Sequence, residues 1–116
     1  MEGIEDIRAV ARYIPISAQK ARLVVDLVRG KDVQEALDIL RFANRRAAKP
    51  VAKVITSAIA NAEENFGLNR DDLYIHRIFA DEAPTRKWRR FGARGRFKPI
   101  LRRSSHITVI LREREA

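Results

Sequence analysis

The chain has 116 residues, of which 24 are Lys or Arg and 15 are Asp or Glu, giving a formal net charge of +9. It contains no cysteine, which excludes disulfides, thiolate chemistry and cysteine metal sites. The length suffices for one modest core, and no apolar run approaches the ~20 residues of a membrane span. We therefore expect a single cytoplasmic domain over residues 1–116, with no signal peptide at its acidic N-terminus.

The first elements expected are a strand at Ile7–Ile14 and a helix at Ala18–Arg29. The strand contains β-branched and aromatic residues and ends before Pro15. Ser17 is expected to cap the helix, since its hydroxyl can accept from the free N–H groups of the first turn. Gly30 is expected to end the helix, because glycine tolerates a left-handed backbone.

Two further helices follow. Asp32 is expected to start the second helix, with Glu35 reaching back in a capping box. Asn44 is expected to close that helix and to cap the third. The third helix requires either a start near Ala47 or a kink at Pro50, and Gly67 ends it. Its residues at three-and-four spacing predict a central, buried helix: Ala47, Val51, Val54, Ile55, Ala58, Ile59 and Ala62.

Two strands close the chain and flank a long arm. Leu73–Ala80 and Ser104–Leu111 are expected to pair and to continue into a hairpin arm at residues 83–103. The globular body then comprises residues 1–82 and 104–116. Counted from Asp81 to the tip near Gly92, about 13 residues per side would reach ~40 Å at roughly 3.3 Å per residue. The predicted fold class is α+β, with three helices on a small three-stranded antiparallel sheet and a long protruding basic hairpin.

The arm carries the whole net charge of the chain. Nine bases lie in Arg86–Arg103, and outside this segment 15 bases balance 15 acids. Trp88, Phe91 and Phe97 lie among the bases, where flat rings could stack on nucleobases while cations neutralise phosphates. A solvated or disordered basic loop is the alternative, and the two flanking strands argue against it. The pattern favours a polyanionic partner.

The sequence offers no convincing catalytic constellation. His76 and His106 fall on predicted strands, where a packing or hydrogen-bonding role is the commoner one. Metal-ligand spacing and phosphate-binding loops are absent. We therefore expect no enzyme activity, metal, cofactor or small-molecule substrate. Weaker nucleic-acid candidates in the body are Arg12, the helix start at Ser17–Lys20, and Asn44–Arg46.

Several segments, in order along nearly the whole chain, resemble the bacterial large-subunit ribosomal protein twenty-two family. They are Arg12–Tyr13, Ile16–Val24, Asp26–Lys31, Glu35–Leu40, Ala58–Glu63, Asp81–Glu82 and Arg103–Val109. The resemblance implies an α+β body that binds large-subunit ribosomal RNA near the exit of the peptide tunnel. It also implies a hairpin whose tip lines the tunnel constriction, beside a neighbouring ribosomal protein and the nascent peptide in transit.

The basic residues and this resemblance together give the expected sites. The expected RNA-binding residues are Arg12, Ser17, Gln19, Lys20, Arg45, Arg46, Arg86, Lys87, Trp88, Arg89, Arg90, Arg94, Arg96, Lys98, Arg102, Arg103, Ser105 and His106. The expected tunnel-lining residues at the tip are Arg89, Arg90, Phe91, Gly92, Ala93 and Arg94.

The arm departs from the family's usual pattern at several positions. The family commonly has a basic residue at the position of Trp88, Pro-Arg at Phe91–Gly92 and a small residue at Phe97. We expect Trp88 and Phe91 either to stack on ribosomal RNA bases or to pack across the hairpin. An alternative function is an architectural DNA-binding protein with a basic β-arm, a class that usually works as a symmetric dimer.

Overall fold

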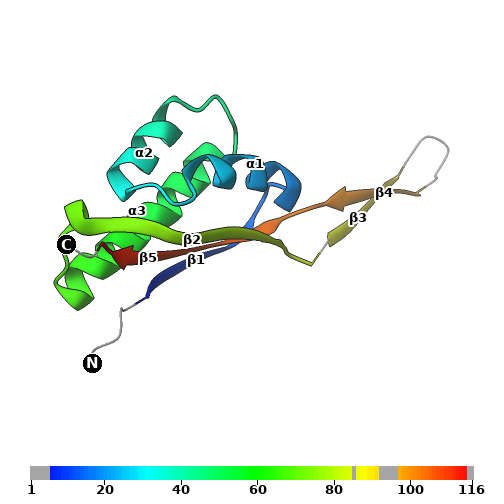
Figure 1. The fold of residues 1–116 in the computed structure, drawn as a ribbon. Coiled ribbons are helices and arrows are strands. Elements are labelled where there is room, and N and C mark those ends of the chain that lie inside the picture. Colours follow the sequence, from blue (N-terminus) through cyan, green and yellow to red (C-terminus); the bar gives the residue numbers. More distant parts are fainter. Residues whose placement is uncertain (1–5, 85, 92–96, 115–116) are drawn as a thin grey trace.

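The computed structural model describes residues 6–84, 86–91 and 97–114, with the backbone alone for the hairpin strands within 86–102. The elements are β1 (Ile7–Ile14), α1 (Ala18–Val28), α2 (Val33–Phe42), α3 (Ala48–Phe66), the 3-10 helix η1 (Arg70–Asp72), β2 (Leu73–Glu82), β3 (Arg86–Phe91), β4 (Phe97–Arg102) and β5 (Ser105–Glu113). An antiparallel sheet has the order β1-β5-β2, and β3 and β4 form a separate pair. The helices cover one face of the larger sheet, and the hairpin projects beyond the body (Figure 1). The predicted α+β fold is confirmed.

Local sequence signals set most of the helix ends. The Ser17 hydroxyl accepts a hydrogen bond from the N–H of Lys20 at 3.3 Å, as expected of a cap. Gly30 and Gly67 have φ angles of +80° and +64°, in the left-handed region that disfavours other residues. Pro50 is the third residue of α3, so its missing N–H falls in the first turn, where no helical partner exists.

Two expected capping interactions are not formed. Asp32 is the N-cap of α2, as expected, but its side chain makes no capping hydrogen bond. Its carboxylate instead accepts from Nε of Arg114 at 2.6 Å, so a partner distant in sequence replaces the capping box. Asn44 caps neither neighbour, because α2 ends with Ala43 as its C-cap and Ala47 precedes α3.

Helix α3 is the central helix of the body, as predicted. It packs against β1, β5, α2 and α1. Its apolar face is buried along its length, and Ala58 and Ala62 have no exposed surface. Small residues at these positions let the strands approach the helix closely. Each fully buried Val or Ile on this face contributes roughly 1.5–3 kcal/mol through the hydrophobic effect.

The edge of the sheet at β2 is covered by α1 and by the loop that follows it. Arg22 on α1 donates from Nε to the carbonyl of Ala80 at 3.1 Å. Arg29 donates to the carbonyl of Ile78 at 2.9 Å. The loop after α1 exchanges two backbone hydrogen bonds with Ile75. These contacts satisfy carbonyls that an open edge would leave free to pair with another chain.

The body and the hairpin have separate ladders. The sequence pattern had suggested continuous strands, but the pairing of β2 with β5 ends at Glu82 and Ser105. One more backbone hydrogen bond, from the N–H of Ala83 to the carbonyl of Ser104 at 3.0 Å, closes the body. The pairing of β3 with β4 then begins at Arg86 and Arg102. The hairpin is therefore a distinct unit joined at residues 83–84 and 103–104.

A buried hydroxyl ties the start of β5 to the segment before α1. Ser105 has no exposed surface, and its hydroxyl donates to the carbonyl of Ile16 at 2.8 Å. This hydrogen bond joins chain positions 89 residues apart. It fixes where α1 begins relative to the base of the hairpin.

Replacing Ser105 with Ala should lower the free energy of unfolding by about 1–3 kcal/mol, because the buried carbonyl of Ile16 then lacks its donor. Urea unfolding followed by circular dichroism measures the change. Ser104→Ala is the matched control. Ser104 is half-buried, so its substitution should change stability by less than about 0.5 kcal/mol. Equal stability of the two variants would contradict the role assigned to Ser105.

Candidate nucleic-acid interface

A basic groove lies at the base of the hairpin, between the start of α1 and the loop that joins α2 to α3. We call it the basal groove. It has a volume of about 640 Å³ and is lined by Pro15, Ile16, Ser17, Lys20, Leu23, Asn44, Arg45, Arg46, Ala47 and Arg103. Four of these residues are cationic and none is acidic. The groove therefore unites expected RNA-binding residues from three separate segments of the chain.

The local structure explains how the cations reach this groove. The Ser17 cap starts α1 so that Lys20 lies in its first turn. The N–H of Ala48 bonds to the carbonyl of Arg45 at 3.1 Å, which forms a turn just before α3. Arg103 follows β4 directly. Lys20, Arg45, Arg46 and Arg103 are all solvent-exposed, so their charges are available to a partner.

A smaller pocket adjoins the basal groove. It has a volume of about 120 Å³ and shares Ser17 and Arg103 with the groove. Gln19 lines it, so this expected RNA-binding residue lies on the same side of the molecule. Glu82 lines it too and brings one negative charge near Arg103. Glu82 therefore offsets part of the positive charge that Arg103 brings to this side of the groove.

Arg12 and His106 lie apart from the residues that line the basal groove. The pairing of β1 with β5 shifts between Ala11 and Ile14, and Tyr13 within this bulge has a φ of +57°. The N–H of Tyr13 donates to Nδ1 of His106 at 3.0 Å, and the two rings meet edge to face at 4.7 Å. Because Nδ1 is the acceptor, Nε2 is the imidazole nitrogen that can donate to a partner. Arg12 is exposed beside this bulge.

Ser105 does not fit its expected contact with RNA. Its side chain is fully buried and its hydroxyl is used by Ile16. Its role in this structure is to hold the segment that forms one wall of the basal groove. The neighbouring His106 is only half-buried, so the expectation for that residue is unaffected.

The expected RNA-binding and tunnel-lining residues of the arm fall in two groups. For some the structure describes the backbone only, and the others lie outside the described residues. The backbone of β3 and β4 carries Arg86, Lys87, Trp88, Arg89, Arg90, Phe91, Lys98 and Arg102. Gly92, Ala93, Arg94 and Arg96 lie outside the described residues. Their expected contacts with RNA and with the tunnel stay predictions.

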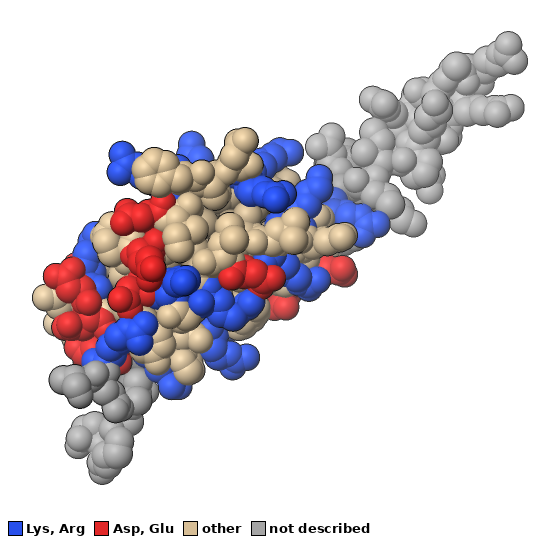
Figure 2. Space-filling view, turned by 45° about the horizontal axis from the view of Figure 1, so that its top comes forward, with Lys and Arg blue, Asp and Glu red and all other residues tan. Residues whose placement is uncertain are grey.

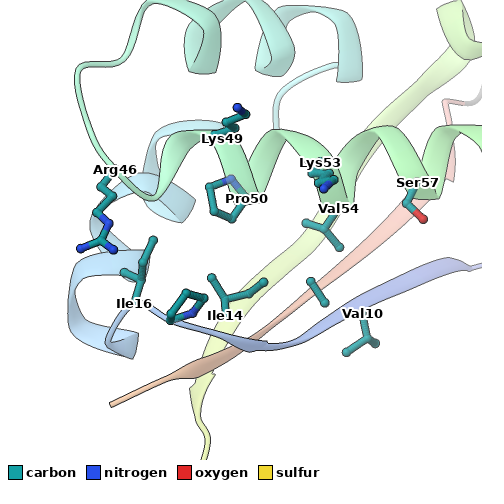
Figure 3. A pocket seen from close by; sticks show the side chains of 11 residues that line it. Val10, Ile14, Ile16, Arg46, Lys49, Pro50, Lys53, Val54 and Ser57 are labelled. Carbon is teal, nitrogen blue, oxygen red and sulfur yellow. The ribbon is translucent and has the colours of Figure 1, made fainter. Parts of the chain in front are cut away.

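A second groove was missed by the sequence analysis. It lies between β1 and α3, has a volume of about 580 Å³ and shares Pro15, Ile16 and Arg46 with the basal groove. We call it the α3–β1 groove (Figure 3). Lys49 and Lys53 on α3 also line it. Their four-residue spacing around Pro50 is the signal available in the sequence, but it reads equally well as a solvated helix face.

Charge is unevenly distributed over the body. In Figure 2 the acidic side chains gather mainly at the end opposite the hairpin, while basic side chains are spread over the whole face, including the end next to the hairpin. The acidic end corresponds to the start of α2, the end of α3 and η1, which carry Glu35, Glu63, Glu64, Asp71 and Asp72. A polyanion would therefore be attracted to the end of the body that bears the hairpin.

One ion pair links the residue just before β1 to β5. Nε of Arg112 donates to the carboxylate of Asp6 at 2.5 Å. This hydrogen bond holds the pKa of Asp6 below its usual value of 3.8 and raises the pKa of Arg112. The charge of Arg112 is thus already compensated within the protein.

The described residues include no group of three or more His, Asp or Glu positioned to hold a metal ion. Among the same residues, no helix has the length and apolar character required to cross a membrane.

Comparison with known proteins assigns the chain to a class and then to a family. The family model described as "Ribosomal protein L22p/L17e" matches residues 9–112, and the chain is accordingly a ribosomal protein. The "Large ribosomal subunit protein uL22" of Thermoanaerobacter sp. (strain X514) is 54% identical over 110 residues, covering 95% of this chain and 99% of the relative. The protein of the same name from Thermoanaerobacter pseudethanolicus (strain ATCC 33223 / 39E) gives the same values. The chain belongs to the L22p/L17e family, which confirms the resemblance found in the sequence.

The ion pair of Asp6 predicts a pH-dependent stability. A carboxylate with a lowered folded pKa stabilises the fold above its unfolded pKa, and this contribution is lost as the pH falls through the folded value. Asp6→Asn should therefore lower Tm slightly at pH 7, and the difference from wild type should vanish below the folded pKa of Asp6. Thermal unfolding at a series of pH values measures this. Asp38→Asn is the control, and a parallel pH dependence in both variants would contradict the assignment.

Proposed function

We propose that this chain is a structural constituent of the large ribosomal subunit that binds large-subunit ribosomal RNA with its hairpin and its basal groove. The observation that carries this proposal is the convergence of four exposed cations, with no acid among the lining residues, where the hairpin meets the body. The family membership and the names of the relatives support the ribosomal setting.

Phosphate neutralisation is the main mechanism of binding. Lys20 and Arg46 face a common groove, so both can contact the same stretch of RNA backbone. The N-terminus of α1 lies at this groove, and the free N–H groups and positive dipole end of a helix favour a phosphate. The groove contributes shape as well, because its walls come from segments that the fold holds at fixed positions.

The hairpin extends this binding away from the body. Residues 86–103 contain nine bases, and their strands project beyond the sheet (Figure 1). We propose that they run along ribosomal RNA and that the tip at 89–94 helps to line the peptide exit tunnel. There it would lie beside neighbouring large-subunit proteins and the nascent peptide. This scaffold role, within one domain, needs no catalytic group.

Sedimentation of lysate through a sucrose gradient after a high-salt wash tests the proposal. The chain should remain with the large subunit, because an arm enclosed by RNA is inaccessible to competing salt. Blotting of the gradient fractions measures this. Release to the top of the gradient would contradict an integral role and would favour the alternative of peripheral binding by a DNA-type β-arm.

The variant Lys20→Ala/Arg46→Ala tests the basal groove itself. Each lost phosphate contact should reduce the magnitude of the slope of log affinity against log salt concentration by about 0.7–0.9. The slope of the double variant should therefore be smaller in magnitude by about 1.4–1.8. Filter binding of the full chain to large-subunit ribosomal RNA at several salt concentrations measures the slope. Lys31→Ala/Arg70→Ala, which removes two exposed cations outside both grooves, is the control. Equal slopes for the two double variants would contradict a role for the basal groove.

A further inference from the structure

The α3–β1 groove has the composition of a binding site that the basal groove alone does not explain. Its floor is apolar, with Val10, Ile14, Pro50 and Val54 among the lining residues. Figure 3 shows Pro50 and Val54 directed from α3 toward β1, opposite Ile14, with Arg46 at one end of the groove and Ser57 at the other. The groove therefore has an apolar floor, and polar side chains lie at both ends.

The rim of this groove is positive. Arg46, Lys49 and Lys53 line it, no acid lines it, and all three cations are exposed. Lys49 and Lys53 are four residues apart on α3, so they lie on neighbouring turns of one helix face. An occupant suited to this groove therefore combines an apolar or weakly polar group with negative charge. An unpaired nucleotide has both properties, and so does an acidic peptide with apolar side chains.

Continuity with the basal groove favours RNA over a peptide. Pro15, Ile16 and Arg46 line both grooves, so a strand bound along one passes directly to the opening of the other. A single RNA strand could thus place its phosphates on Lys20 and Arg46 and continue toward Lys53. Proteins that recognise RNA commonly take up unpaired bases splayed out from loops and bulges.

We propose that the α3–β1 groove is a distinct RNA site, which holds one unpaired nucleotide of large-subunit ribosomal RNA. The base or ribose lies on the apolar floor between β1 and α3, where it gains dispersion contacts with Pro50 and Val54. The adjoining phosphates pair with Lys49 and Lys53, and the Ser57 hydroxyl is available to hydrogen-bond the base. This inference rests on the proposed function, because it takes ribosomal RNA as the partner.

The charged rim is tested with Lys49→Ala/Lys53→Ala. Filter binding of the full chain to large-subunit ribosomal RNA should show a salt slope reduced by about 1.4, from two contacts of about 0.7 each on a single strand. The control variant Lys31→Ala/Arg70→Ala should leave the slope unchanged. Both pairs are exposed, and circular dichroism verifies that each variant is folded.

The apolar floor is tested separately by filling the groove. Ser57→Trp places a large ring in the groove without changing charge, and it should lower the affinity for ribosomal RNA by about tenfold at fixed salt. Thr56→Trp is the matched control, because Thr56 is exposed on the same helix but is absent from the lining of the groove. The control should bind as wild type does.

The outcomes separate this inference from the proposed function. If Lys49→Ala/Lys53→Ala and Ser57→Trp bind as their controls do, while Lys20→Ala/Arg46→Ala is impaired, the nucleotide site is overturned and the basal groove stands. If all of these variants bind RNA as wild type does, both groove sites are overturned, and the sedimentation experiment alone decides whether the hairpin part of the proposed function stands. If Ser57→Trp binds RNA normally but yields large subunits that lack a neighbouring protein, the groove is a peptide site and the RNA proposal is overturned.

Discussion

The hydrogen bond between the hydroxyl of Ser105 and the carbonyl of Ile16 is the contact on which the arrangement of this protein most depends. It joins the segment before α1 to the strand that returns from the hairpin, at 2.8 Å and without solvent exposure. Both grooves use that segment as a wall, since Pro15 and Ile16 line each of them. A side chain that never touches a partner thus sets the shape of the surface that does.

Charge acts at a longer range than this contact. Acidic side chains gather mainly at the end of the body opposite the hairpin (Figure 2), whereas the basal groove is lined by four cations and no acid. Such a distribution orients the molecule in the field of a polyanion before any contact forms. The grooves then select among orientations by shape. The groove cations therefore contribute both to the attraction and to the fit.

Local patterns in the sequence predicted the elements well, because their causes are local. The cap at Ser17, the left-handed glycines and the apolar face of α3 need only neighbouring residues. The capping box at Asp32 failed because Arg114, 82 residues away, competes for the same carboxylate. Lys20, Arg45, Arg46 and Arg103 could be predicted as RNA-binding candidates because they are basic. That the four line one groove could not be predicted, because it depends on the fold. Lys49 and Lys53 were missed because an exposed helix face and a groove rim have the same spacing.

The division between the two ladders has a mechanical consequence. Because the pairing of β2 with β5 is closed by the bond from Ala83 to Ser104, the register of the body is fixed independently of what happens beyond it. The length of the hairpin can therefore change without altering the strand pairing of the body. Two residues added to each of its strands would preserve which side chains face which side, and would extend its reach by about 7 Å. A fold of this kind can be fitted to cavities of different depth by changing one loop, while the core that anchors it stays the same.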